Sequence, residues 1–259
     1  MAKPRIAFFD FACCEGCQLQ VANLGEDLLE ILKIVDVVNF REVMSEKSDD
    51  YDIAVIEGSI TDHHAVERLK KIRQNAKTLI AYGSCAVTGG VNGMKNKFDL
   101  EEIKKYVYKD SAKYFDTIKT HAVHQVVKVE YFVPGCPVYI PEFIKVLKAA
   151  VLGVPCPVPD YSVCVECRLN ENVCLYEKGI VCLGPVTRAG CNSWCINNGN
   201  TCYGCRGMVS NPAENAAKEV LKKYNIPLEW IENKMDMYNK ARELDIAKQQ
   251  EGKANREKK

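Results

Sequence analysis

Eight of the 14 cysteines of this chain lie between Cys164 and Cys205, in the order C-x2-C-x6-C-x7-C-x8-C-x3-C-x6-C-x2-C. Thiolates at such short spacing are typical of metal sites or of a disulfide framework. The tightest grouping gives two four-thiolate sites, the first of Cys164, Cys167, Cys174 and Cys182, and the second of Cys191, Cys195, Cys202 and Cys205. An exchange of ligands between the two sites stays open, because one cysteine of a local run can serve a neighbouring cluster.

Iron–sulfur clusters, zinc ions and disulfides are the three cross-links that such cysteines can form. Four-thiolate zinc sites use C-x2-C pairs, but their second pair usually follows about 15–20 residues after the first. The first group here contains only one such pair. Disulfides are rare in compartments that keep thiols reduced. We therefore predict iron–sulfur clusters, with zinc as the first alternative.

The first half of the chain is predicted to form strands and helices that carry further cysteines. Short apolar runs alternate there with helical patterns, which is typical of βαβ units and a parallel sheet. The expected strands are residues 5–9, 35–40, 53–57, 78–82 and 129–133. Apolar residues at helical spacing predict four helices, over about 18–32, 63–72, 100–107 and 141–152. Thr61 or Asp62 is the expected cap of the second helix.

Four further cysteines follow the ends of these predicted strands. Cys14 and Cys17 follow the first strand, Cys85 follows the fourth, and Cys136 follows the fifth. The carboxyl ends of parallel strands meet at one edge of a sheet, which is where ligands bind. Cys85 and Cys136 could instead be small buried hydrophobic side chains. Three cysteine-bearing loops at one edge favour a shared metal site.

The segments predict an α/β sheet domain, then a loop-rich metal segment, then C-terminal helices. We expect them over residues 1–155, 156–210 and 211–247, with a flexible tail over 248–259. Helical and strand periodicity disappears between residues 156 and 205, so we expect bound metals to hold that segment together.

Two helices are expected after the metal segment. Asn211 and Pro212 are a cap and a first-turn proline. Pro227 opens a last helix on which Met235 and Tyr238 share an apolar packing face with Leu228 and Ile231.

The composition excludes several classes of protein. Hydrophobic residues make up 47% of the chain and charged residues 27%, with a net charge of +1, as in an ordinary globular protein. No basic stripe suggests nucleic acid, and no apolar run approaches the roughly 20 residues of a membrane span. A Walker loop and a dinucleotide fingerprint are also missing, so we expect neither nucleotide nor flavin. The start does not look like a signal peptide, which predicts a cytoplasmic protein.

Together these motifs resemble a known family. CEGCQLQ at residues 14–20, GSC at 83–85, GCP at 135–137, and then CVECRLN, CLGPVTRAGC and CYGCRG look like the small subunit of cytosolic nickel–iron hydrogenases. The likeness is greatest to the delta subunit of archaeal sulfhydrogenases and to the corresponding subunit of methyl-viologen-reducing hydrogenases. It runs from about residue 4 to residue 207.

The resemblance implies a flavodoxin-like first domain that carries the proximal cluster on Cys14, Cys17, Cys85 and Cys136. It implies medial and distal clusters in the second segment, and a separate large subunit that holds the nickel–iron site. By resemblance this chain is an oxidoreductase subunit that conducts electrons without itself splitting dihydrogen. The cysteine groups described above then belong to the distal cluster (Cys164, Cys167, Cys174, Cys182) and to the medial cluster (Cys191, Cys195, Cys202, Cys205).

Two departures from the periplasmic branch of the family concern single ligands. That branch has a histidine at the distal position that Cys164 occupies here, and its medial cluster has three cysteine ligands where Cys195 supplies a fourth. We therefore expect three 4Fe–4S clusters. Cys13 and Cys14 could instead act as a tandem pair of ligands, although the C-x2-C pair of Cys14 and Cys17 is favoured, and Cys156 is expected to be structural.

The partners expected by resemblance are the large subunit and an acceptor that is a flavoprotein, ferredoxin-like or part of a heterodisulfide reductase. The terminal acceptor stays open. The alternatives are a zinc-stapled assembly protein without redox role and a freestanding ferredoxin-like carrier. Among other residues, Glu15 and Glu57 are expected either to face the proximal site or to be solvated, and the four histidines, residues 63, 64, 121 and 124, are expected at the surface.

Overall fold

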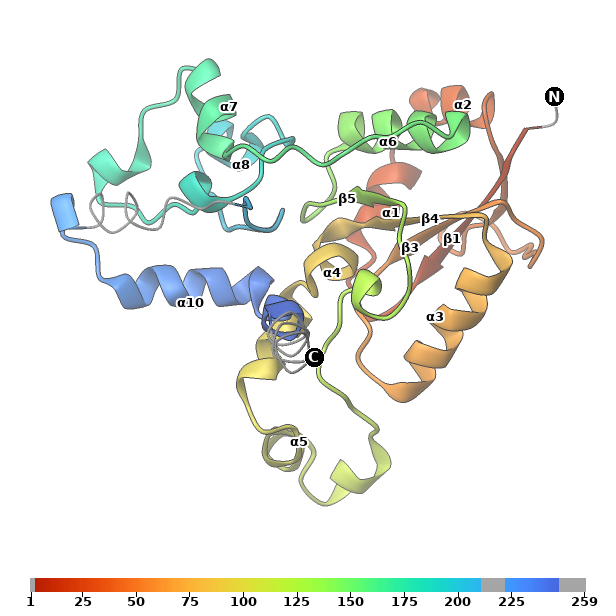
Figure 1. The fold of residues 1–259 in the computed structure, drawn as a ribbon, viewed down its shortest axis with the longest axis horizontal. Coiled ribbons are helices and arrows are strands. Elements are labelled where there is room, and N and C mark those ends of the chain that lie inside the picture. Colours follow the sequence, from red (N-terminus) through yellow and green to blue (C-terminus); the bar gives the residue numbers. More distant parts are fainter. Residues whose placement is uncertain (1–2, 211–221, 247–259) are drawn as a thin grey trace, which may run out of the picture.

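Figure 1 shows a computed structural model of the chain, which describes residues 3–210 and 222–246. A five-stranded sheet in the order β2-β1-β3-β4-β5 has every neighbouring pair parallel. The strands are β1 (Arg5–Asp10), β2 (Asp36–Asn39), β3 (Ile53–Glu57), β4 (Thr78–Tyr82) and β5 (Tyr131–Val133). This strand order is that of flavodoxin, so the predicted flavodoxin-like α/β fold is confirmed.

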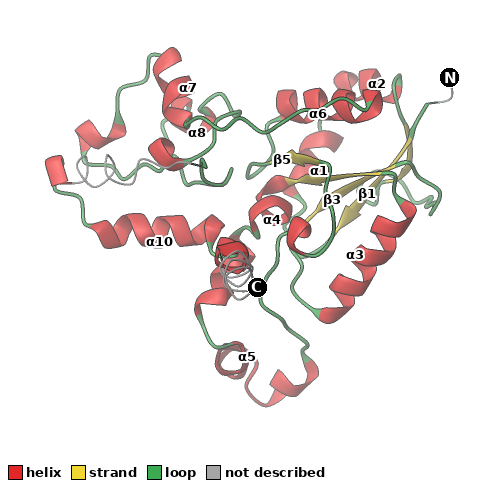
Figure 2. Ribbon diagram, viewed as in Figure 1, coloured by secondary structure: helices red, strands yellow, loops and turns green. Residues whose placement is uncertain are grey.

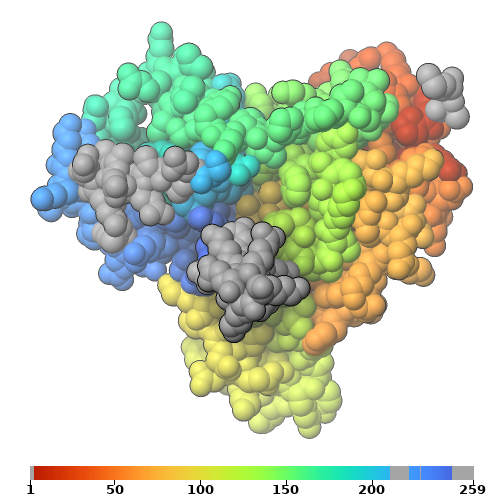
Figure 3. Space-filling view, viewed as in Figure 1, coloured from red at the N-terminus to blue at the C-terminus, as the bar shows by residue number. Residues whose placement is uncertain are grey.

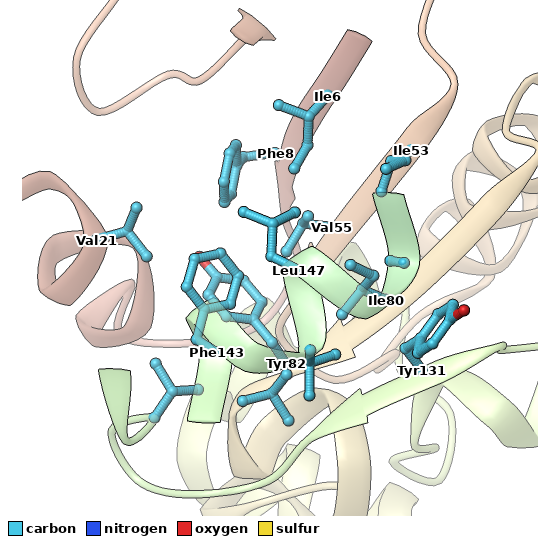
Figure 4. Close-up of a cluster of buried hydrophobic side chains, with 14 of the residues drawn as sticks. Ile6, Phe8, Val21, Ile53, Val55, Ile80, Tyr82, Tyr131, Phe143 and Leu147 are labelled. Atoms are coloured by element: carbon cyan, nitrogen blue, oxygen red, sulfur yellow. The ribbon is translucent and has the colours of Figure 1, made fainter. Parts of the chain in front are cut away.

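Helices cover both faces of the sheet because alternate strand residues point to opposite sides. On one face, helices α1 (Gly16–Ala22), α2 (Glu26–Leu32) and α6 (Ile140–Leu152) pack on a core that Figure 4 shows, in which Phe8, Tyr82 and Phe143 lie together. On the other face, helix α3 (His63–Asn75) buries Leu69 and Ile72 against the sheet.

The predicted helix over 18–32 is wrong in one respect: two helices replace it. Helix α1 ends at Ala22, and α2 begins at Glu26 after Gly25, whose φ is +59°. Left-handed backbone of this kind interrupts a helix and is accessible to glycine at little cost. The apolar spacing continues across the break, since Val21 and Ile31 belong to the same core, and the spacing alone therefore did not reveal it.

The edge of the sheet that carries the cysteine loops continues into short helices. Helix α4 (Gly83–Thr88) follows β4 directly. A lobe beyond it is built of η1 (Val91–Lys97), α5 (Leu100–Tyr108) and η2 (Lys109–Tyr114), and η3 (Val123–Gln125) leads back towards β5. The helix expected over 100–107 is confirmed as α5, with Asp99 accepting hydrogen bonds from the backbone of Glu101 and Glu102 as its cap.

The segment from 156 to 210 is loop-rich, as Figure 2 shows. Its regular structure is limited to short helices: α7 (Val163–Leu169), η4 (Leu175–Lys178), η5 (Gly184–Val186) and α8 (Trp194–Asn197). Helix α10 (Leu228–Asn239) runs alongside, and in Figure 3 the two form one lobe beside the sheet domain.

This lobe has a small apolar core in addition to the metal sites that are expected to hold it together. Val163, Leu183 and Ile196 from the segment pack with Ile231 of α10. The helices of this segment are too short to show apolar periodicity in the sequence. Their core is instead assembled from single residues that come from many different turns. The domain limits at 155 and 210 stay a prediction. The helix start expected at Asn211 and the tail over 248–259 lie outside the described residues.

A buried ion pair joins the two parts of the molecule. The Arg206 guanidinium, 1% exposed, donates from Nη1 and Nη2 to the two carboxylate oxygens of Glu142 on α6, at 2.6 and 2.7 Å. It also donates to the backbone carbonyls of Pro134, Arg188 and Ala189. Gly190 has φ +115°, and a Cβ there would overlap Arg206 Nη2. The guanidinium therefore fits only because residue 190 has no side chain.

Asp52, before β3, provides a pH-dependent contribution to the stability of the sheet. Hydrogen bonds from Lys77 Nζ (2.7 Å) and the Arg5 amide (2.8 Å) lower the pKa of Asp52. A lowered pKa stabilises the fold above the carboxyl group's unfolded pKa, and this stabilisation is lost as the pH falls through the folded value. We expect Asp52→Asn to destabilise the protein by about 1 kcal/mol at pH 7 and by less near pH 3. Denaturant titrations at the two pH values test this, and an equal loss at both would contradict it.

Among the described helices, none combines the length and the apolar character that crossing a bilayer requires.

Candidate metal centres

The four cysteines predicted at the sheet edge line one cavity. Cys14 and Cys17 come from the loop after β1 and the start of α1, Cys85 from α4 after β4, and Cys136 from the loop after β5. All four border a cavity of about 300 Å³ at the carboxyl ends of the strands. The structure thus brings together residues that are up to 122 positions apart, from Cys14 to Cys136. Such a donor set, with a space of this size between the thiols, fits an iron–sulfur cluster.

Glycines make room for the thiols around this cavity. Gly83 has φ +82°, and a Cβ there would lie 2.6 Å from Cys17 Sγ. Gly90 has φ +56°, and a Cβ there would lie 2.7 Å from Cys85 Sγ. Both distances are shorter than real contacts, so a side chain at either position would displace a thiol. Gly83 therefore belongs to the cavity wall, and Gly90 leaves room for the Cys85 thiol behind it.

Glu57, at the end of β3, is 2% exposed and also borders the cavity. Its two carboxylate oxygens accept hydrogen bonds from the backbone amides of Cys17 (3.1 Å) and Gln18 (3.0 Å). The alternative of a solvated Glu57 is thus wrong, and the carboxylate instead holds the first turn of α1 in place. Glu15 is partly exposed and forms an ion pair with Arg41.

The environment of Cys17 and Cys85 raises the pKa of both thiols. Burial, followed by the neighbouring Glu57 carboxylate, raises the pKa of Cys17. Burial, followed by the neighbouring Cys136 and Cys14 thiols, raises the pKa of Cys85 to about 12. Metal ligation needs thiolates, so cluster binding at this cavity must release protons.

Cys13 and Cys156 lie apart from the cavity lining. Cys14 borders the cavity whereas Cys13 does not, which favours the C-x2-C pair of Cys14 and Cys17 over a tandem pair. Cys156 packs, partly buried, against the core between the sheet and α6. This placement agrees with a structural role.

The four cysteines of the first group in the second segment also lie close together. They are Cys164, Cys167, Cys174 and Cys182. A Cβ at Gly184 would lie 3.3 Å from Cys164 Sγ and 3.4 Å from Cys182 Sγ, so these two thiols flank one glycine. Burial, followed by the charges of Cys182, Cys167 and Cys174, raises the pKa of Cys164 to about 12. Each predicted member of this group therefore lies within electrostatic reach of Cys164.

The second group lies between the other two. The backbone amide of Cys136 donates a hydrogen bond to the Cys205 thiol, which links this group to the cavity at the sheet edge. On its other side, Cys202 lies within electrostatic reach of Cys182. The three groups thus follow one another in the order edge cavity, second group, first group. That order is not the order of the sequence, where the second group comes last.

Several residues that sequence reasoning missed hold these loops. Glu166, between Cys164 and Cys167 on α7, accepts hydrogen bonds from the backbone amides of Gly190 (2.7 Å) and Ser193 (3.1 Å). It therefore ties the helix of one cysteine group to the loop that carries Cys191. The sequence offered one sign of these roles: Glu166 lies inside a C-x2-C pair, and Arg206 directly follows Cys205.

The histidines lie apart from these sites. His63 is exposed and pairs with Asp116, and His124 pairs with Asp245. In residues 3–210 and 222–246, the structure has no group of three or more His, Cys, Asp or Glu side chains arranged to hold a single metal ion.

Comparison with known proteins identifies the class that this fold and cavity define. The profile of the family "NADH ubiquinone oxidoreductase, 20 Kd subunit" matches residues 14–150. Sulfhydrogenase 2 subunit delta of Pyrococcus furiosus is 34% identical, over 89% of this chain and 97% of that protein. One subunit of the F420-non-reducing hydrogenase vhu of Methanococcus voltae is 31% identical, over 80% of this chain and 83% of that protein.

Solved structures agree with these relatives. A chain of the NAD⁺-reducing [NiFe]-hydrogenase in its H2-reduced state superposes with a TM-score of 0.54 at 26% identity, covering 61% of this chain and 96% of that one. A chain of the [NiFeSe]-hydrogenase of Dm. baculatum, 17% identical, shares the fold with a TM-score of 0.58, over 80% of this chain and 95% of that one.

The chain belongs to the NADH ubiquinone oxidoreductase 20 kDa subunit family, and within it to the small, electron-transfer subunits of nickel–iron hydrogenases. It is an oxidoreductase subunit whose catalytic site lies on another subunit, the large subunit. The family implies iron–sulfur clusters, for which the cysteine groups described above are the candidate ligands. The zinc-stapled assembly protein and the freestanding carrier are not the functions that these relatives support.

Proposed function

We propose that this chain relays electrons through three 4Fe–4S clusters between the nickel–iron site of the large subunit and a partner reductase. The proposed ligands are those expected from the sequence: the edge cavity holds the proximal cluster, the group of Cys191, Cys195, Cys202 and Cys205 holds the medial cluster, and the group of Cys164, Cys167, Cys174 and Cys182 holds the distal cluster. When bound, the clusters supply one-electron redox chemistry, and the chain's residues hold and insulate them.

The exposure of the thiols is the observation that carries this proposal. Of the twelve proposed ligands, only Cys14, Cys136 and Cys174 are exposed. Two of these belong to the first site of the series and one to the last, whereas the four medial thiols are all at least partly buried. A relay needs this arrangement, because electrons must enter and leave at its ends and be shielded from solvent between them.

The exposed ends suggest where the partners bind. The large subunit would cover the Cys14 and Cys136 end, since the site nearest the catalytic centre must face it. The acceptor would bind near Cys174, and we propose a flavoprotein, a ferredoxin-like protein or a component of a heterodisulfide reductase in that role. We also propose a cytoplasmic location for the complex, where clustered thiols stay reduced.

Metal analysis of the anaerobically purified complex tests this function. We expect brown protein with about twelve irons contributed by each copy of this chain, since three clusters of four irons are proposed. Removing the iron with a chelator should bleach the visible absorption and destabilise residues 156–210, because metal binding there is coupled to folding. Colourless protein with about two zinc ions in each chain would contradict the relay and support a zinc-stapled scaffold.

A further inference from the structure

Helix α10 passes all three proposed cluster sites, although it contains no cysteine. In Figure 1 it runs beneath the cysteine-rich lobe and ends beside α4 of the sheet domain. The sequence pattern assigned its Met235 and Tyr238 to an apolar packing face. The structure shows that polar atoms of this helix reach the loops that carry the cysteines.

Lys234 lies where the proposed medial and distal sites meet. Its ammonium group donates to the carbonyl of Val181 (2.6 Å) and to the hydroxyl of Thr201 (3.1 Å). These are the residues immediately before Cys182 and Cys202. The same ammonium lies 4.3 Å from the centre of the Tyr203 ring. The two oxygen acceptors and the aromatic ring together fix its position.

One turn further along, Tyr238 reaches the proposed proximal site. Its hydroxyl lies within hydrogen-bonding reach of the Cys136 thiol. The neighbouring Asn239 side chain donates to the carbonyl of Gly204 (3.2 Å), next to Cys205. The helix therefore contacts both sides of the junction between Cys136 and Cys205.

The end of α10 is anchored by close packing. A Cβ on Gly89 would lie 2.6 Å from Ala241 Cβ, which means that the chain after α10 approaches the backbone of residue 89 directly. Gly90, the next residue, faces Cys85. The Gln125 side chain also donates to the Ala241 carbonyl (3.0 Å). These contacts hold Tyr238 in register with the cavity.

We propose that α10 is a positioning element that sets the potentials of the relay, with Tyr238 as hydrogen-bond donor to the Cys136 thiolate and Lys234 as a positive charge beside Cys182 and Cys202. This inference rests on the proposed function. A hydrogen bond to a ligating sulfur and a nearby cation both stabilise the reduced, more negative cluster, and both therefore raise its reduction potential.

The test is a redox titration of the assembled hydrogenase complex, followed by electron paramagnetic resonance. For Tyr238→Phe we expect the ratio of reduced to oxidised proximal cluster at a fixed potential to fall about tenfold, which is 59 mV for one electron. Lys234→Met should shift the medial or distal signal in the same direction, and Lys234→Arg, which keeps the charge, should restore it. Tyr106→Phe on the exposed face of α5 is the matched control and should shift nothing.

Iron content separates this inference from the function on which it rests. Iron retained in both variants, with the expected shifts, supports tuning by α10. Iron retained with no shift in either variant overturns it and leaves the relay standing. Loss of iron from Tyr238→Phe would mean that Tyr238 is needed to retain the cluster, and it would also contradict the proposal that α10 sets the potentials. A wild-type complex without iron would instead mean that the proposed function has failed.

Discussion

Replacing Cys136 with alanine is expected to stop dihydrogen-dependent dye reduction by the assembled complex while isotope exchange at the nickel–iron site continues. The proposed proximal cluster is the first stop for electrons that leave the large subunit, and Cys136 is central to it. Its thiol borders the edge cavity, and its amide donates to the Cys205 thiol of the next site. About four of about twelve irons should be lost, since one cluster would be incomplete.

Two other cysteine variants serve as controls for this experiment. Cys156→Ala removes a partly buried thiol that packs against the core and borders none of the proposed sites, so dye reduction should persist. Cys13→Ala should also retain activity, because Cys14 and not Cys13 borders the cavity. Unchanged dye reduction by Cys136→Ala would contradict the relay. Loss of activity in Cys13→Ala would instead indicate the tandem cysteine pair.

The second large effect is expected at Arg206. In Arg206→Met, the nearly buried Glu142 carboxylate loses its partner, and the carbonyls of Pro134, Arg188 and Ala189 lose a donor. Removing one partner of a buried ion pair typically costs about 3–5 kcal/mol. Because the pair joins α6 to the cysteine-rich segment, we expect that segment to separate from the sheet domain first. A lowered thermal midpoint, together with faster proteolysis after residue 156, would show this.

A double variant distinguishes the cost of an unpaired charge from the cost of lost packing. Arg206→Met combined with Glu142→Leu removes both charges, and it should recover much of the stability lost in the single variant. Lys33→Met breaks an ion pair whose two side chains are each 67% exposed, and it should cost less than about 1 kcal/mol. If Arg206→Met were as mild as Lys33→Met, the ion pair would not be what joins the two parts.

The sheet domain was predictable because its strands are continuous apolar runs. Residues 53–57 and 78–82 were predicted as strands with the limits that the structure has. The edge cavity was predictable too, because the carboxyl ends of parallel strands lie at one edge of the sheet regardless of the conformation of the loops. The break at Gly25 was missed because helical spacing continues through it. Glu57 was left undecided because a carboxylate at a strand end gives no sign of its burial.

The roles of the polar residues that hold the sites in place could not be predicted from the sequence. Glu166 ties two loops, and its partner Gly190 is 24 positions away. Tyr238 resembled one more residue of an apolar face, and its contact with Cys136 spans 102 positions. Such pairs have no fixed spacing, since they depend on how α10 and the cysteine-rich loops are placed in space.

The number of thiols, their local groups and the parallel sheet follow directly from the amino-acid sequence, because cysteine spacing and apolar periodicity are local properties of the chain. The order of the sites and the exposure of their thiols depend instead on how the chain folds in space. So does the placement of polar side chains, such as Arg206 and Lys234, beside the sites. Those features arise from packing between segments far apart in the chain, and packing is a property of the folded molecule as a whole.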